Sequence, residues 1–306
     1  MRFLLVSSFF LVLCVLSLGC RPRPTGRTKV VVSVFPIYDL TRRVAGPDAD
    51  VVLLLAPGRS EHTFDPTPRD IEAAASSQLG VMVGLGLDPW MEKLVRDAAP
   101  KARLVQLGNL VPTIAVRDDF VGDMEEDHDD HEHHHEQGGP DPHVWLDPNR
   151  AAVLAIRLGD ELAAVDPVHA EGYRARAQGL SDALLLLDKE VLEHSQAWKG
   201  KPVVTFHGSF GYFADRYGLR IVAVIEPLPG ATPTGSYVLA VLKVVRDKHA
   251  VALFSEPQLD ARPAEILARE AKIPLGVLDP VGGGSDTDSY EKMTRFNVAA
   301  LDRVLR

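Results

Sequence analysis

Short apolar runs alternate with amphipathic stretches along most of the chain, and their order is nearly the same in its two halves. The repeated order is apolar run, amphipathic stretch, apolar run, at residues 30–35, 37–44 and 51–55 and again at 203–206, 210–217 and 221–225. Continuous apolar strands separated by amphipathic helices are typical of parallel sheets that are covered by helices on both faces.

Each half continues with further helix and strand units. The additional predicted strands lie at residues 81–85 and 104–107 in the first half, and at 251–254 and 275–278 in the second. Thr67 and Asp88 each precede a proline, which is the pattern of a helix N-cap followed by proline at the first helical position. We therefore predict an α/β fold with two similar lobes, each containing a roughly four-stranded parallel sheet flanked by helices.

Residues 168–198 contain no proline, and apolar or amphipathic side chains recur there at steps of four and three. This spacing predicts one continuous, rigid helix, ~45 Å long at ~1.5 Å per residue, that joins the lobes. The predicted domains are an N-terminal lobe at 30–166, the linking helix at 167–199 and a C-terminal lobe at 200–306.

The N-terminal segment has the layout of a secretory signal, with Arg2, an apolar run at residues 3–18, and then Gly19 and Cys20. We predict a signal peptide at 1–19, a lipid on Cys20 and a tether at 20–29. The mature protein would then be an exported, membrane-anchored lipoprotein on the extracytoplasmic side, in the periplasm or at the cell surface.

A membrane-spanning anchor is the alternative for this segment, although its apolar run is short for a bilayer core that needs ~20 residues. Ser17 stands where lipoprotein signals usually carry a large aliphatic residue, which leaves lipidation open. Cys14 and Cys20 are the only cysteines, so the folded part offers no thiol, and any metal must be held by nitrogen and oxygen.

The net charge of −9 comes from one segment, because residues 118–136 contain ten acidic residues and no basic ones. No concentrated basic face favours a nucleic-acid partner. The same acidic loop, at 118–142, carries five histidines that would bind metals weakly beside a main site: His128, His131, His133, His134 and His135. A solvated loop without this role is the alternative.

Four residues are candidate ligands for a metal. His62 follows the predicted strand at 51–55, His207 follows the strand at 203–206, and Asp279 follows the strand at 275–278. Ligands of open parallel sheets bind outside the carboxyl ends of the strands. Together with His143, two residues from each half would converge between the lobes, and four is the ligand number that Zn²⁺ prefers.

Two glutamates, Glu226 and Glu256, also follow predicted strands of the second half. They are candidates to accept a hydrogen bond from a ligand imidazole, or to cap a helix or face water.

The sequence resembles the metal-specific solute-binding proteins of ABC importers that serve zinc and manganese (cluster A-I), over essentially the whole mature chain. The resemblance is carried by VVVSVFPIYDL, HTFDPTP, DPHVWLDP, TFHGSFGYFADRYGL, FSEPQ and LDP. It implies His62, His143, His207 and Asp279 as the metal ligands, with Glu61 as the alternative fourth ligand. It also implies an ABC-type membrane permease as partner and a protein that acts as a monomer.

The resemblance further favours zinc, because manganese members place a glutamate where this chain has His207. Three imidazoles suit borderline-soft Zn²⁺, whereas harder Mn²⁺ prefers more oxygen. The expected function is high-affinity extracytoplasmic capture of Zn²⁺ and delivery to an ABC importer, without enzymatic activity. The alternatives are a Mn²⁺-specific member of the family, a zinc-dependent hydrolase, and a surface adhesin with the same fold.

Overall fold

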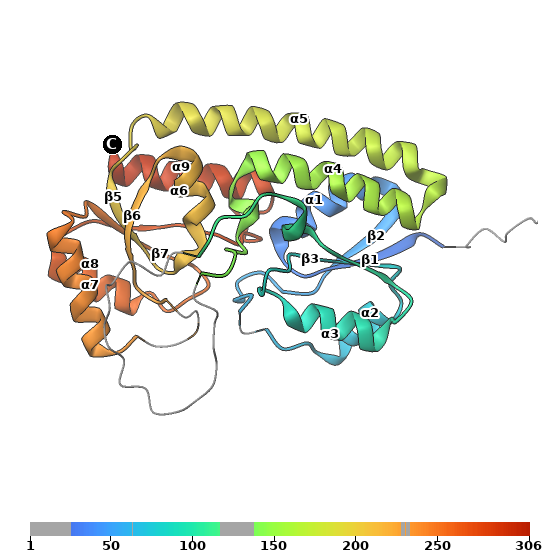
Figure 1. Ribbon diagram of the computed structural model, residues 1–306, viewed down its shortest axis with the longest axis horizontal. Coiled ribbons are helices and arrows are strands. Elements are labelled where there is room, and N and C mark those ends of the chain that lie inside the picture. The colour runs from blue at the N-terminus through green and yellow to red at the C-terminus, as the bar shows by residue number, and fades with distance from the viewer. Residues whose placement is uncertain (1–25, 63, 117–137, 228–229, 231–232) are drawn as a thin grey trace, which may run out of the picture.

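The computed structural model describes residues 26–62, 64–116, 138–227, 230 and 233–306. Figure 1 shows two α/β lobes side by side, with a long helix running along one face of both. The predicted signal peptide, Cys20 and the five histidines of the acidic loop lie outside the described residues.

The N-terminal lobe is a parallel sheet with the strand order β2-β1-β3-β4. Its strands are β1 (Thr28–Val32), β2 (Ala49–Leu53), β3 (Leu79–Met82) and β4 (Arg103–Gln106), and its helices are α1 (Phe35–Ala45), α2 (Pro68–Ala75) and α3 (Pro89–Ala98). Alternate side chains of β1 face opposite sides, so Val31 packs with α2 and α3 while Val30 and Val32 pack on the α1 side.

The C-terminal lobe repeats this plan, with the strand order β6-β5-β7-β8, again all parallel. Its strands are β5 (Pro202–Thr205), β6 (Arg220–Val224), β7 (Ala252–Ser255) and β8 (Leu275–Val277), and its helices are α6 (Gly211–Tyr217), α7 (Gly235–Asp247) and α8 (Arg262–Ala271). The predicted fold class, two four-stranded parallel lobes with flanking helices, is confirmed.

The helix that links the lobes is α5 (Ala170–Ser195), which is shorter at both ends than the helix predicted at 167–199. Pro167–His169 forms a separate 3₁₀ turn before it, and the residues after Ser195 form turns. Helix α5 packs along α4 (Pro148–Val165) (Figure 1). A side chain on Gly159 would lie 2.7 Å from Cβ of Ala177, so glycine lets the two helices approach closely. In the described part of the chain, no helix combines the length and apolar character needed to cross a bilayer.

The last helix, α9 (Tyr290–Leu305), was not assigned from the sequence. At its start the backbone N–H of Tyr290 donates to Asp39 of α1, at 3.0 Å. Near its other end Asp302 accepts from Trp198, at 3.1 Å. Apolar side chains of α9, α4, α5 and both sheets form one core cluster, so the lobes share a hydrophobic interior.

Candidate metal centre

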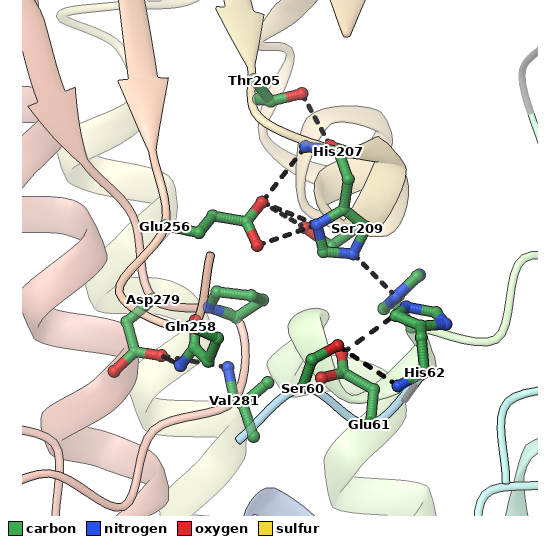
Figure 2. A network of polar contacts seen from close by, with 12 residues as sticks. Ser60, Glu61, His62, Thr205, His207, Ser209, Glu256, Gln258, Asp279 and Val281 are labelled. Atoms are coloured by element: carbon green, nitrogen blue, oxygen red, sulfur yellow. Dashed lines mark hydrogen bonds and ion pairs between the residues drawn. The ribbon is translucent and has the colours of Figure 1, made fainter. Parts of the chain in front are cut away.

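Three of the predicted ligands meet between the lobes, together with Glu61. His62 and Glu61 lie in the loop after β2, His143 lies just before the 3₁₀ turn Val144–Leu146, and His207 follows β5. Their candidate ligand atoms all lie within 4.8 Å of one another (Figure 2). We call Glu61, His62, His143 and His207 the imidazole cluster. Among the described residues, no second group of three or more such side chains comes together in this way.

The rings of the imidazole cluster face a common point. Ring centroids are 5.9 Å apart for His62 and His143, 5.5 Å for His62 and His207, and 5.2 Å for His143 and His207. The Nε2 atoms of His143 and His207 are 3.4 Å apart, and Nε2 of His62 lies 3.8 Å from Oε1 of Glu61. Nitrogen and oxygen donors from both lobes therefore point into one small, buried space.

Two carboxylates fix the orientation of two of these rings. Nδ1 of His143 lies 2.8 Å from Oδ1 of Asp141. Nδ1 of His207 lies 2.8 Å from both oxygens of Glu256, as Figure 2 shows. A carboxylate only accepts, so each Nδ1 carries the proton and donates it. When such a ring is neutral, its Nε2 points a lone pair into the cluster, which is how ligand histidines are held in metal sites.

The sheet topology explains the pairing of His207 with Glu256. β5 and β7 are parallel neighbours, so the residues that follow them leave the sheet at the same edge. Thr205 supports the turn after β5, because its hydroxyl donates to the carbonyl of His207 at 3.0 Å (Figure 2). The suggestion that Glu256 accepts from a ligand imidazole agrees with this geometry.

His143 is positioned by a turn and not by a strand end. Asp147 caps the following helix α4, accepting from the backbone of Asn149 at 2.8 Å. The buried ring of Trp145 packs edge-on against His143, with centroids 5.3 Å apart, and its Nε1 donates to the carbonyl of Pro280 at 2.7 Å. The DPHVWLDP segment thus contacts the loop after β8 of the other lobe.

The electrostatics of the imidazole cluster favour protonation of His207 in the metal-free protein. Burial alone lowers its pKa, but the charge of Glu256, the hydrogen bond to it, and the charges of Glu61 and Asp141 raise the pKa to about 9. Burial raises the pKa of Glu61, an effect opposed by His207 and His143. In the protonated ring the second proton is on Nε2, which faces Nε2 of His143. This proton therefore occupies the side of the ring at which a metal ion would bind.

Asp279, the predicted fourth ligand, is not part of the imidazole cluster. Its carboxylate accepts four hydrogen bonds within its own lobe. Oδ1 accepts from Nε2 of Gln258 at 2.7 Å and from the backbone N–H groups of Val281 at 3.2 Å and Gly282 at 2.8 Å. Oδ2 accepts from the hydroxyl of Thr287 at 3.0 Å. The structure therefore brings the alternative residue, Glu61, to the imidazoles.

Asp141 was missed in the sequence. It stands two residues before His143, and its Oδ1 also accepts from the backbone N–H of His143 at 2.9 Å. An aspartate whose side chain bonds the backbone two residues on is a common turn, so the letters DPH carried this signal.

Two α/β lobes that hold buried imidazoles between them define a two-lobed solute-binding protein with a metal-type site. The chain belongs to the family described as the periplasmic component A of the zinc-uptake complex, ZnuA, which it matches over residues 30–304. The family predicted from the sequence is confirmed.

Several relatives carry zinc in their names. The zinc-binding lipoprotein AdcA of Streptococcus pneumoniae serotype 4 is 30% identical over 306 residues, covering 96% of this chain and 58% of that protein. The zinc-binding protein AdcA of Streptococcus pyogenes serotype M3 is 28% identical, covering 89% of this chain and 54% of that protein. The high-affinity zinc uptake system protein ZnuA of Brucella abortus is 28% identical, covering 88% and 89%. The chain spans little more than half the length of the AdcA proteins.

Solved structures share the fold. The laminin-binding adhesin Lmb of Streptococcus agalactiae superposes with a TM-score of 0.77 at 23% identity, covering 91% of this chain and all of the adhesin. The solute-binding protein FpvC of Pseudomonas aeruginosa, in complex with Mn²⁺, gives 0.78 at 22% identity, covering 92% and 98%. At this level of identity the likeness concerns the fold.

Proposed function

We propose that this chain captures Zn²⁺ outside the cytoplasm and delivers it to an ABC-type permease, acting as a carrier and not as an enzyme. The observation that carries the proposal is the imidazole cluster, in which four donor groups from three distant parts of the chain lie within 4.8 Å of one another. Family membership and the zinc-related names of its relatives support the same function.

The proposed ligands are Nε2 of His62, His143 and His207, with the carboxylate of Glu61 as the fourth. Three imidazoles and one carboxylate suit tetrahedral Zn²⁺, whose bonds to nitrogen and oxygen are ~2.0–2.2 Å. Glu61 is preferred to Asp279, because Glu61 offers an oxygen within 4.8 Å of the imidazole ligand atoms and Asp279 is not in that group. Metal would displace the proton of His207 and leave the Nδ1 bonds to Asp141 and Glu256 in place.

Zinc is preferred to manganese because of the donor set. Three nitrogen donors and one oxygen favour the borderline-soft ion, whereas oxygen-rich sites favour Mn²⁺. FpvC, whose fold is similar, has been crystallised with Mn²⁺ and with Ni²⁺, so the fold itself does not select the metal. Selection is proposed to reside in the side chains of the imidazole cluster.

The proposal includes export and membrane attachment. Residues 1–19 would be removed, Cys20 would carry lipid, and residues 20–29 would separate the lobes from the membrane; the lipoprotein name of the Streptococcus pneumoniae relative supports this arrangement. The acidic loop with His128, His131 and His133 to His135 would collect Zn²⁺ weakly near the main site.

Elemental analysis and competitive metal titration of residues 21–306 test this function. We expect one tightly bound Zn²⁺ per chain and several weak ones. Deletion of residues 123–136 should abolish the weak binding and leave the tight site intact. Loss of tight binding in the deletion variant, or tight binding of Mn²⁺ in preference to Zn²⁺, would contradict the proposal.

A further inference from the structure

The support of His143 depends on a single buried carboxylate. Oδ1 of Asp141 lies 2.8 Å from Nδ1 of the ring and accepts from the backbone N–H of the same residue at 2.9 Å. Both N–H groups of His143 therefore converge on one oxygen. Any rotation of this carboxylate changes the direction in which Nε2 of His143 points.

The backbone of Asp141 is itself fixed from two sides. Its N–H donates to the carbonyl of Ile114 at 2.8 Å, and its carbonyl accepts from the hydroxyl of Tyr212 at 2.6 Å. With the main chain held, the remaining freedom of Asp141 is the rotation of its side chain. The space around the carboxylate then decides which rotation is adopted.

Gly211, the first residue of α6, leaves that space open. A Cβ placed on Gly211 would lie 2.5 Å from Oδ2 of Asp141 and 3.3 Å from Cδ1 of Ile114. Carbon and oxygen atoms do not approach this closely, so an alanine there must displace the carboxylate. Because Oδ2 is the end of a side chain and not part of the backbone, the fold can absorb the change by turning Asp141.

We propose that Asp141 is a positioning residue for His143, and that Gly211 is required at the start of α6 because the carboxylate of Asp141 occupies the place of its missing side chain. The inference rests on the proposed role of the imidazole cluster in binding zinc. It adds two residues, neither of which touches the metal, to the determinants of affinity.

The first test compares two glycines in equivalent places. Gly211→Ala should weaken Zn²⁺ binding by about 10- to 100-fold, the usual cost of disturbing an outer partner of a ligand histidine. Gly235→Ala is the matched control, because Gly235 also opens a helix of the same lobe and a Cβ there would meet no atom of the described residues within 4 Å. Its affinity should equal that of the wild type.

A double-mutant cycle distinguishes action through Asp141 from a general disturbance of α6. Asp141→Ala removes the carboxylate that clashes, so Gly211→Ala should cause no further loss of affinity in that background. If the two losses multiply, Gly211 does not act through Asp141. Should Asp141→Ala fail to fold, the ring tautomer of His143 in the two glycine variants separates these explanations, because it reports on the bond to Asp141.

The ring tautomer of His143 gives a readout that needs no metal. In the metal-free wild type, ¹⁵N NMR should find the proton on Nδ1 of His143, and Gly211→Ala should shift it partly to Nε2 while Gly235→Ala leaves it unchanged. A wild type without tight zinc binding would refute the proposed function. A wild type that binds zinc while both glycine variants match it, in affinity and in tautomer, would overturn the present inference.

Discussion

Two buried carboxylates near the gap between the lobes, Glu61 and Asp279, are candidates for the same ligand position, and their surroundings differ. Glu61 and Asp279 are 2% and 5% exposed. Oε1 of Glu61 accepts no hydrogen bond from the described residues and faces Nε2 of His62. Both oxygens of Asp279 accept hydrogen bonds from its own lobe.

The difference teaches that burial alone does not assign a carboxylate to a metal. What separates the two residues here is position, because Glu61 offers an oxygen within 4.8 Å of the three imidazole ligand atoms and Asp279 does not belong to that group. Asp279 orders the loop after β8, and that loop packs on the other lobe, since a Cβ on Gly283 would lie 3.1 Å from Pro57 and 3.2 Å from Phe35. We interpret Asp279 as an organiser of the contact between the lobes.

The largest effect is expected from removing His207, which is a proposed ligand whether Glu61 or Asp279 is the fourth. His207→Ala should weaken Zn²⁺ binding by about 100- to 1,000-fold, because binding free energies of roughly 10–16 kcal/mol divided among four ligands leave about 2.5–4 kcal/mol for each. The control is His169→Ala, a half-exposed histidine that pairs with Asp166. Competition titration with a chromophoric chelator measures the Zn²⁺ affinity of both variants. Equal affinities for His207→Ala and His169→Ala would contradict the assignment of His207 as a ligand.

The pH dependence of Zn²⁺ affinity should respond differently to substitution of the two carboxylates, Glu61 and Asp279. The raised pKa of His207, about 9 against 6.5, means that zinc must displace a proton, so affinity should rise about tenfold per pH unit between pH 7 and 9. Glu61→Gln should move the upper end of this rise to lower pH, because the charge of Glu61 helps to hold the proton. Asp279→Asn should leave it in place. The profiles come from titrations in buffers of matched ionic strength.

The same shift has a signature in the metal-free protein. A pKa that is higher in the folded than in the unfolded state stabilises the fold fully below pH 6.5, and this contribution is lost as the pH rises through 9. Thermal unfolding of the chelated protein should therefore show stability falling across that window. A stability that is flat there would contradict protonation of His207.

Substitution of either carboxylate is expected to change the Zn²⁺ affinity less than the loss of an imidazole. Glu61→Gln should weaken Zn²⁺ binding at least about tenfold, since a charged ligand is replaced by a neutral amide that binds zinc poorly. Asp279→Asn should change affinity by less than about threefold. An Asp279→Asn variant with the larger loss would reverse the assignment of the fourth ligand.

The smallest effect is expected in stability, with the opposite ranking. Asp279→Asn should lower the free energy of unfolding of the metal-free protein by about 1–3 kcal/mol, because the amide nitrogen cannot accept from buried donors. Glu61→Gln should leave the stability unchanged or raise it, since it removes a carboxylate whose charged form is penalised by burial. Denaturant unfolding in the presence of a chelator measures both variants.

Much of the fold was readable from the sequence because local patterns specified it. The strand that became β5 was predicted at 203–206 and lies at Pro202–Thr205, and Thr67 and Asp88 precede α2 and α3 as predicted. Helix α9 was missed although Ser289, an N-cap that accepts from Lys292, precedes buried residues at Tyr290, Met293 and Val298.

The imidazole cluster was readable only in part. His62 and His207 follow strands, so the rule that ligands bind at strand ends found them, whereas His143 depended on the DPHVWLDP motif. The same rule favoured Asp279, because a residue directly after β8 also meets it. Its exclusion from the cluster depends on backbone donors at Val281 and Gly282 and on Gln258 from another loop, which no local pattern reports.

The C-terminal helix limits how the molecule can move. The backbone N–H of Tyr290 donates to Asp39 of α1 and its hydroxyl donates to the carbonyl of Trp145. Asp302 pairs with His194 in the last turn of α5 and accepts from Trp198 just after it. A clamshell opening would have to break these ties and expose a shared apolar interior. Cargo should instead leave by local rearrangement of loops, so small-angle X-ray scattering curves with and without zinc should superimpose.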